Sequence, residues 1–225
     1  MKAWCWLLVA LAGISFAEVP KAQAQDIDLQ ALVRETQITR QASQGLDLVW
    51  WIPSDYWVES LRKSALTPKQ QQDLVAAVDD YILVAALQGT IGTLGVMSSI
   101  SKEELEKETT LVIGKTSLSP IPEGDLSPGA RNFIQMMKPL LANMMGAMGQ
   151  GMHFIAFKGK DAEGKHLVDP KAKGRIVVKM GAKEFPFRLP LGSLLPPKID
   201  TDSGEHFPGN YDYNPFTGKK LIASK

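Results

Sequence analysis

The sequence predicts an α+β protein with a mainly antiparallel β-sandwich core, helices at the N-terminus and in the middle of the chain, and a turn-rich C-terminal appendage. The strongest strand patterns lie between residues 151 and 197. Met152–Phe157 is an apolar run of strand length, and Arg175–Met180 and Lys183–Leu189 flank a turn at Gly181-Ala182. These three strands predict an antiparallel unit against which the other segments pack.

The first 24 residues are predicted to be a signal peptide that is removed on export. Lys2 gives the positive start, Ala3–Ala17 is an apolar run, and Ala22-Gln23-Ala24 supplies the small-residue cleavage pattern. Cleavage after Ala17 and an uncleaved membrane anchor are the two alternatives. We therefore expect a periplasmic or secreted protein that begins at Gln25 and has no transmembrane segment after cleavage.

The composition of the mature chain argues against several classes of function. Removing residues 1–24 takes away Lys2, Lys21 and Glu18, which leaves 23 basic and 23 acidic residues. A net charge near zero argues against a nucleic-acid partner. The single cysteine, Cys5, lies in the predicted signal peptide, so we expect no disulfide, no thiol nucleophile and no thiolate-bound zinc. The sequence predicts no cofactor.

The first two elements of the mature chain are predicted to be a helix and a strand. Asp26–Ser43 carries a loose apolar stripe at helical spacing. Leu46–Ile52 alternates in the manner of a strand and stops at Pro53, although one continuous helix up to this proline is the alternative. Ser54 or Asp55 is then expected to cap a short helix.

The middle of the chain is predicted to contain two longer helices and several strands. Thr67-Pro68 and Ser127-Pro128 each combine a capping hydroxyl with proline at the first helical position. Pro139 predicts a kink or a break in the second of these helices. The other predicted elements are a strand over Tyr81–Leu87, a hairpin within Gln88–Ile100, a short helix over Ser101–Lys107 and a strand over Thr109–Ile113.

About half of the chain resembles the immunoglobulin-like modules of exported bacterial proteins. An apolar strand, a polar glycine-containing turn and the strand exit at Leu189-Pro190-Leu191 carry this resemblance. It implies an immunoglobulin-like sandwich as the core of a helix-decorated domain over residues 25–197. Residues 198–225 form a separate tail in this division.

Aromatic residues gather in one segment near the N-terminus of the mature chain. Its three tryptophans all lie within Trp50–Trp57, and exported proteins often use such rings to stack on sugars or to anchor partners. Trp51 lies on the opposite face of the predicted strand from Trp50 and is expected to be the most exposed. Core packing is the alternative. The predicted ligand-binding residues are Trp50, Trp51, Tyr56 and Trp57.

Methionines gather in a second segment. Six of the eight methionines of the mature chain lie in Met136–Met152, and His153 follows directly. Thioether and imidazole ligands suit Cu(I), so one alternative is a copper site. The other is core packing, because most of these residues continue an apolar helix stripe. The copper ligands would be Met144, Met145, Met148 and His153.

The tail contains two four-residue turns that each end at glycine, Asp200–Ser203 before Gly204 and Asn214–Thr217 before Gly218. The pattern resembles a rubredoxin-type zinc ribbon, C-x-x-C-G … C-P-x-C-G-x-K-L, with all four cysteines replaced. Two unrelated turns are the alternative. The vestigial ligand positions are Asp200, Ser203, Asn214 and Thr217.

Because no ligand cysteine remains in the tail, the resemblance implies no bound metal. Each turn is instead expected to close on the side-chain oxygen of its first residue, Asp200 or Asn214. Aromatic packing is expected to join the two turns. The available side chains are Phe207, Tyr211, Tyr213 and Phe216.

Taken together, these patterns predict an exported, non-enzymatic binding or interaction module with a protein or glycan partner in the cell envelope. The sequence has no G-x-S-x-G elbow, H-E-x-x-H motif or P-loop, and we predict no catalytic residues. His153, His166 and His206 fall in a strand, a loop and the tail. The alternatives are a Cu(I)-binding protein and a glycan-active enzyme.

Overall fold

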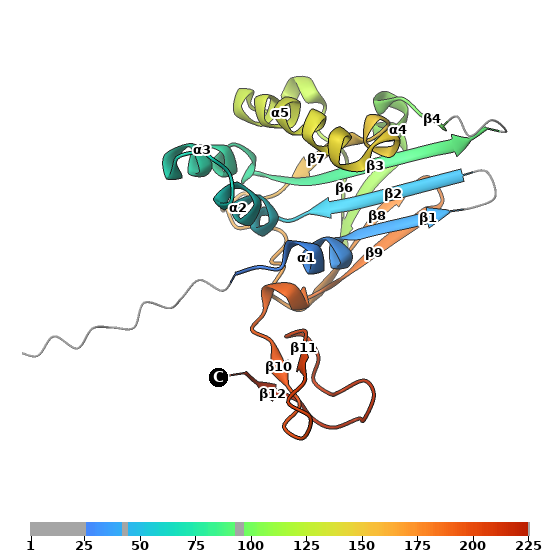
Figure 1. Cartoon of the computed structure of the whole chain (residues 1–225). Coiled ribbons are helices and arrows are strands. Elements are labelled where there is room, and N and C mark those ends of the chain that lie inside the picture. The colour runs from blue at the N-terminus through green and yellow to red at the C-terminus, as the bar shows by residue number, and fades with distance from the viewer. Residues whose placement is uncertain (1–25, 42–44, 93–96, 225) are drawn as a thin grey trace, which may run out of the picture.

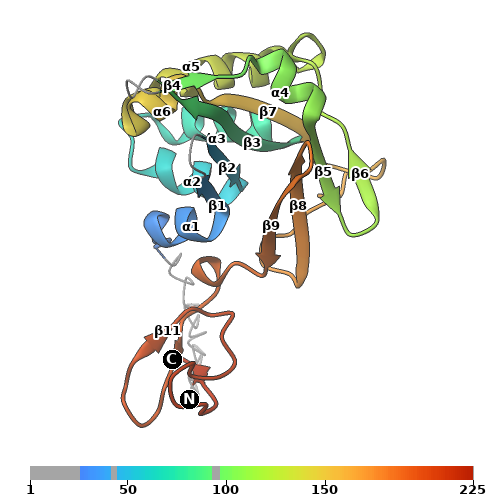
Figure 2. The same cartoon turned by 90° about the vertical axis from the view of Figure 1, so that its right-hand side faces the viewer.

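The computed structural model describes residues 26–41, 45–92 and 97–224, so the predicted signal peptide lies outside the described residues. Two open antiparallel sheets pack against each other, helices cover the other face of the first sheet, and a small third sheet lies in the tail (Figures 1 and 2). The prediction of mixed helix and antiparallel sheet is confirmed. The immunoglobulin-like arrangement is not, because the sheets are open and helices occupy one of the faces.

The first sheet has five strands, and β3 is its centre. Strands β1, β2 and β3 lie side by side, while β7 and β4 pair with successive parts of the far edge of β3. The apolar run within β3 is continuous rather than alternating because both of its faces are buried. The bounds are β1 (Gln37–Gln41), β2 (Gly45–Ile52), β3 (Tyr81–Ile91), β4 (Met97–Ser99) and β7 (His153–Lys158).

The register of the first sheet assigns side chains to its two faces. Opposite residues of antiparallel strands point to the same side. Trp50 lies opposite Ala85, and Ala85 lies opposite Phe154, so these three share the face covered by helices. Trp51 and Val84 are also opposite each other and share the face toward the second sheet.

The second sheet contains the hairpin predicted about Gly181-Ala182, which is confirmed. Phe185 and Phe187 are buried, and the ring centroids of Phe187 and Trp51 lie 6.0 Å apart, so this sheet packs on the first. Its strand order is β6-β5-β8-β9. The bounds are β5 (Thr109–Ile113), β6 (Thr116–Leu118), β8 (Gly174–Met180) and β9 (Lys183–Leu189).

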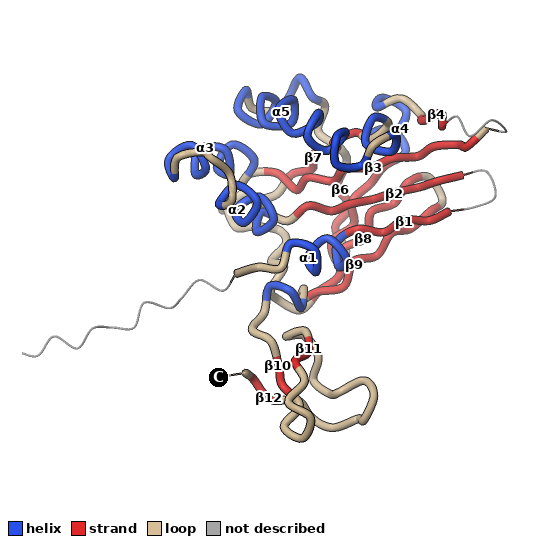
Figure 3. Tube along the Cα trace, viewed as in Figure 1, coloured by secondary structure: helices blue, strands red, loops and turns tan. Residues whose placement is uncertain are grey.

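Local capping sets the start of three of the helices, which Figure 3 shows in blue. Thr67 and Gln70 form a reciprocal capping box, Ser101 and Glu104 form another, and the side chain of Ser127 accepts from the third amide of its helix. The α-helices are α1 (Leu29–Thr36), α2 (Ser54–Arg62), α3 (Pro68–Val78), α4 (Lys102–Glu108), α5 (Pro128–Met145) and α6 (Ala147–Gln150), with 3₁₀ turns η1 (Glu123–Asp125) and η2 (Gly192–Leu194).

The helix predicted over Asp26–Ser43 is wrong in its second half, where the chain forms β1. The Thr36 hydroxyl closes α1 and accepts a hydrogen bond from Trp50 Nε1 at 3.2 Å. Ile38 then pairs with Val49. Edge pairing with β2, together with β-branched residues, therefore overrides the helical stripe.

Two smaller predictions concern proline positions: the first needs correction, and of the kink or break expected in the second the break is absent. Pro53 itself occupies the cap position of α2, and neither Ser54 nor Asp55 caps that helix. Helix α5 is not broken at Pro139, and it continues to Met145. The predicted Gln88–Ile100 hairpin is seen as the pairing of β3 with β4, while its connecting residues 93–96 lie outside the described residues.

The tail forms a three-stranded sheet that lies at the opposite end of the molecule from α5 in both views (Figures 1 and 2). Two hydrogen bonds attach it to η2 and to Pro190, which lies between β9 and η2. The amide of Gly209 donates to the carbonyl oxygen of Gly192 at 3.3 Å, and Asn210 Nδ2 donates to the carbonyl oxygen of Pro190 at 3.0 Å. The strands are β10 (Lys198–Ile199), β11 (His206–Phe207) and β12 (Ile222–Ala223).

None of the helices within the described residues has the length and apolar character needed to cross a membrane.

Candidate functional site

The four aromatic residues predicted to bind a ligand are all buried in the structure. Trp51, expected to be the most exposed, has only 3% of its surface exposed. That expectation is wrong because the second sheet covers its face, with Phe187 against the indole ring. The covering strand lies far along the chain, so the local alternation of β2 carries no sign of it. The buried residues are Trp50, Trp51, Tyr56 and Trp57.

These rings join the first sheet to its helical layer. The ring centroids of Trp50 and Tyr56 are 5.0 Å apart, and Trp57 lies edge-on to Phe133 of α5 at 4.9 Å. A cavity of about 50 Å³ lies beside Trp51 and Trp57. Sites for small molecules usually have volumes of roughly 300–1,000 Å³, so this cavity has room for water but not for a sugar.

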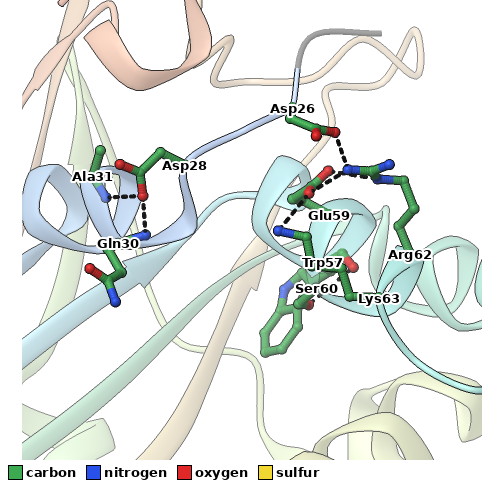
Figure 4. A network of polar contacts seen from close by, with 9 residues as sticks. All are labelled: Asp26, Asp28, Gln30, Ala31, Trp57, Glu59, Ser60, Arg62 and Lys63. Atoms are coloured by element: carbon green, nitrogen blue, oxygen red, sulfur yellow. Dashed lines mark hydrogen bonds and ion pairs between the residues drawn. The ribbon is translucent and has the colours of Figure 1, made fainter.

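A buried carboxylate of α2, Glu59, has a structural role. Arg62 donates to both oxygens of Glu59, at 2.8 and 3.0 Å, and also reaches Asp26 at the start of the described chain (Figure 4). The hydrogen bond from Arg62 is the main cause that lowers the pKa of Glu59. Glu59 is therefore an ionised anchor for the N-terminal segment rather than a general acid.

The glycan-active alternative would need a pair of carboxylates in a cleft, and three carboxylates line a cleft of about 520 Å³. Asp47 accepts from Lys183 Nζ at 2.7 and 2.9 Å, and this ion pair ties β2 to β9. Glu104 is engaged in the capping box of α4, and Glu108 is the third carboxylate. Two of the three groups thus hold the fold together. Within residues 26–41, 45–92 and 97–224, no cluster of three or more His, Cys, Asp or Glu side chains is arranged to hold a metal.

The predicted copper ligands differ widely in burial. Met144 points to solvent, Met145 and Met148 are half-buried, and His153 is half-buried in β7. His153 Nδ1 is buried without a hydrogen-bond partner among the described residues, and burial lowers the pKa of this histidine. Register places the imidazole on the face of Ala86, opposite to the helix-covered face. These positions do not favour a shared copper site.

The first turn of the tail closes on Asp200. Its Oδ1 atom accepts from the amides of Asp202 at 2.9 Å and Ser203 at 3.4 Å, and its carbonyl oxygen accepts from the amide of Gly204 at 2.8 Å. The turn ends in a left-handed residue, Gly204, with φ of +73°. The Ser203 hydroxyl oxygen accepts in turn from the amide of Glu205 at 3.2 Å.

The second turn repeats this geometry bond for bond. Asn214 Oδ1 accepts from the amides of Phe216 at 2.8 Å and Thr217 at 3.3 Å, and the Asn214 carbonyl oxygen accepts from Gly218 at 2.8 Å. Gly218 has φ of +72°, and the Thr217 hydroxyl oxygen accepts from the amide of Lys219 at 3.4 Å. The expected closure of each turn on its first side chain is therefore present.

A buried hydrogen bond joins the two turns, and the sequence analysis did not predict it. Asn214 Nδ2 donates to Asp200 Oδ2 at 2.5 Å, and both side chains are almost fully buried. The available sequence signal was that one turn begins with an aspartate and the other with an asparagine, because the carboxamide of asparagine can donate a hydrogen bond to a carboxylate. The expected aromatic packing does not form this link, since Tyr211, Tyr213 and Phe216 are exposed and Phe207 is the one buried side chain of the four.

The link between the turns sets the ionisation of Asp200. The hydrogen bond from Asn214 is the main cause that lowers the pKa of Asp200, the amides of Asp202 and Ser203 act in the same direction, and burial opposes them. The pKa of Asp200 is lower in the folded state than its unfolded value of about 3.9, so ionised Asp200 stabilises the fold at pH values above this unfolded pKa. The stabilisation is lost as the pH falls through the folded pKa.

We expect Asn214→Ala to raise the pKa of Asp200, because the strongest bond to its carboxylate is removed. Carboxyl ¹³C chemical shifts, followed by NMR from pH 7 to pH 2, measure the titration midpoint of Asp200 in the wild type and the variant. Ser203→Ala serves as the control, since it retains the Asn214 bond and both amide bonds. An unchanged midpoint in Asn214→Ala would contradict the role given to this bond.

The tail thus combines a rigid two-turn scaffold with aromatic side chains that project from it. Asp200, Asn214 and the two glycines fix its backbone, while Tyr213 and Phe216 remain exposed. This exposed aromatic surface is the candidate functional site. Comparisons with protein-family models, with curated proteins and with solved structures gave no match to this chain.

Proposed function

We propose that this protein is an exported, non-enzymatic binding module that contacts a protein partner of the cell envelope through its tail. The observation that carries the proposal is the concentration of exposed apolar side chains there. Of the eight large hydrophobic side chains exposed among the described residues, four belong to the tail, which is a small part of the chain. They are Tyr211, Tyr213, Phe216 and Ile222.

The rigidity of the tail supports a binding role. The amide of Phe216 is bonded to Asn214 Oδ1, so the backbone that carries the ring is fixed while the ring itself is in solvent. A contact residue on a pre-organised scaffold loses less conformational freedom when it binds. Aromatic side chains that enter a pocket of the partner are also the commonest energetic anchors of protein interfaces.

The charge distribution supports a protein partner over a glycan. Lys198 pairs with Asp212 at 2.7 Å, and Lys219 pairs with Asp202, so several charged groups of the tail already have internal partners. The side chain of Phe216 is apolar and is the most exposed large hydrophobic side chain among the described residues. An apolar pocket on a protein matches it better than a carbohydrate, which requires polar contacts around the stacking ring.

We further propose that the tail is a zinc ribbon in which the Asp200–Asn214 hydrogen bond has replaced the metal. The matching geometry of the two turns supports this, as does the direct contact between two of the four vestigial ligand positions. The export of the protein is part of the same proposal. It is supported by the predicted signal peptide over residues 1–24.

The test is capture from detergent-solubilised cell envelope with immobilised wild type, Phe216→Ser and a control, Val58→Ser. Val58 is half-exposed and lines a groove of about 560 Å³ between α2 and α3, so the control removes an apolar side chain away from the tail. A captured protein is then purified and titrated against each variant. We expect at least ~10-fold weaker binding for Phe216→Ser and unchanged binding for Val58→Ser.

Two outcomes would contradict the proposal. If Val58→Ser lost binding while Phe216→Ser kept it, the contact surface would be the groove between α2 and α3. Binding of the wild type to peptidoglycan or to arrayed glycans, lost in Phe216→Ser, would make the partner a glycan.

A further inference from the structure

The outer face of the second sheet carries a pair of like charges that the proposed function does not use. Arg175 of β8 lies directly opposite Arg188 of β9 in the strand register, and both side chains are exposed. Their neighbours Ile176 and Phe187 are buried, and side chains alternate along a strand, so the two arginines point away from the core. Directly opposite side chains have Cβ atoms about 4.5–5.5 Å apart, so both guanidinium groups can reach one point above the sheet.

Two exposed lysines extend this pair across the same end of the sheet. Lys173 directly precedes β8. Lys115 lies in the turn between β5 and β6, at the end of β5 that adjoins the start of β8. Lys115, Lys173, Arg175 and Arg188 are together called the basic patch.

No acidic side chain balances the basic patch within the part of the chain that the structure describes. None of its four residues forms an ion pair or a side-chain hydrogen bond there, whereas other lysines on and beside β8 and β9 are paired. Glu184, the one acidic residue of these two strands, is bonded to Lys179. The paired lysines form the ion pairs Lys171–Asp55, Lys179–Glu184 and Lys183–Asp47.

The opposed arginines indicate what the basic patch binds. Like charges directly opposite each other on a sheet are destabilising, so this pair has a cost in the free protein. The planar fork of an arginine donates paired hydrogen bonds to a phosphate group. A phosphate group above the sheet, between the two forks, would remove the repulsion and fill both sets of donors.

The shape of the basic patch favours a surface of phosphate groups over a single enclosed ion. Its residues line none of the cavities at Trp51, at Asp47 or between α2 and α3. They spread over the β5–β6 turn, β8 and β9, on an open sheet face that half-buried Val177 and Pro186 continue. A row of cations on an open face complements the plane of headgroups of an anionic lipid layer, which attracts basic residues.

We propose that the basic patch docks this protein on an anionic lipid surface through the phosphate groups of the lipids. Each basic residue near such a surface adds to the attraction, and dissolved salt screens it. The proposal shares with the proposed function only the export of the chain.

The basic patch lies at the end of the sheet from which the tail continues. The tail follows β9 through η2 (Figures 1 and 2). The hydrogen bond from Lys198 is the main cause that lowers the pKa of Asp212 in the tail, and the charge of Lys173 acts in the same direction. Docking through the basic patch would therefore hold the tail close to the membrane.

Cosedimentation of the exported, mature protein with vesicles tests the proposal in the wild type, the double variant Arg175→Gln/Arg188→Gln and the control Lys107→Gln/Lys138→Gln. Lys107 on α4 and Lys138 on α5 are exposed and lie outside the second sheet, so both double variants change the net charge equally. On vesicles of phosphatidylglycerol and phosphatidylcholine, we expect at least ~10-fold weaker binding for the arginine variant and wild-type binding for the control. Vesicles of phosphatidylcholine alone should bind none of the three proteins.

Thermal unfolding of the same proteins shows whether the arginine variant is folded. Because the substitution removes two opposed like charges, its melting temperature should equal or exceed that of the wild type. Lost vesicle binding in such a protein cannot come from misfolding. A lower melting temperature would show that the two arginines support the sheet and would contradict their assignment to a ligand.

Several results would overturn the proposal. These are equal binding to phosphatidylcholine alone, equal loss of binding in both double variants, and no vesicle binding by the wild type. Binding of inorganic phosphate or of soluble polyglutamate without binding to vesicles would make the ligand a soluble phosphate or an acidic protein. The proposed function fails separately, because Phe216→Ser should bind vesicles like the wild type, and the arginine variant should keep its affinity for the purified partner in detergent.

Discussion

Trp51→Ala should lower the free energy of unfolding by about 3–5 kcal/mol, which is the usual range for removing a large aromatic side chain from a core. Trp51 is buried between the two sheets and contacts Phe187 of β9. Without the indole ring a cavity would remain between the two sheets, because the strand pairing within each sheet keeps the backbone from closing it. Urea unfolding followed by circular dichroism gives the change from the shift in the midpoint.

Phe216→Ala provides the matched control for this core substitution. It also removes an aromatic ring, but one that is 82% exposed, so stability should change by no more than about 0.5 kcal/mol. The two variants therefore separate core packing from surface recognition. If Trp51→Ala were as stable as the wild type and instead lost binding to the envelope partner, the aromatic segment Trp50–Trp57 would be the contact surface after all.

Elements with strong local signals could be predicted from the sequence. The capping hydroxyls of Thr67 and Ser127 begin α3 and α5, because a helix start depends on residues within one turn of it. The hairpin about Gly181-Ala182 likewise depends on two adjacent strands and a tight turn. Each of these predictions involved residues that are close together in the chain.

Elements decided by distant contacts could not be predicted in this way. The change from α1 to β1 depends on the edge that β2 offers, and the burial of Trp51 depends on a strand that lies more than a hundred residues later. Helix α5 shows the same limit in reverse. Helical spacing places Phe133, Met137 and Met144 on one apolar stripe, but the core covers only the first two.

The tail lies between these two cases. The turns at Asp200 and Asn214 are local and follow from residue type, whereas the hydrogen bond that joins them spans fourteen positions. A sequence can indicate that two such side chains are complementary. It does not indicate that they meet, because that depends on the path of β11 and of the connection to the second turn.

Cysteine at all four vestigial positions should convert the tail into a zinc site. The substitutions are Asp200→Cys, Ser203→Cys, Asn214→Cys and Thr217→Cys. Asp200 and Asn214 are already in contact, and the Ser203 and Thr217 oxygens accept amide hydrogen bonds from Glu205 and Lys219. Structural zinc in small cysteine sites binds with an apparent free energy of about 10–16 kcal/mol, which far exceeds the loss of the Asp200–Asn214 bond.

Cobalt substitution reports the geometry of the new site, because Co(II) bound by four thiolates in a tetrahedron gives characteristic visible absorption. We expect the four-cysteine variant to bind one metal ion and to lose tail structure when a chelator removes it. The wild type should show neither effect, because its turns close on side-chain oxygens and on the Asp200–Asn214 bond.

A double variant with only Asp200→Cys and Ser203→Cys provides the control, since one turn supplies two thiolates and should bind metal far more weakly. Asn214→Ala alone should lower the stability of the tail by roughly 1–3 kcal/mol, as expected for an interrupted buried hydrogen bond. If the four-cysteine variant remained folded but bound no metal, the side chains of the two turns would not converge on one point. The pairing of the turns would then be a local packing solution with no relation to a metal ribbon.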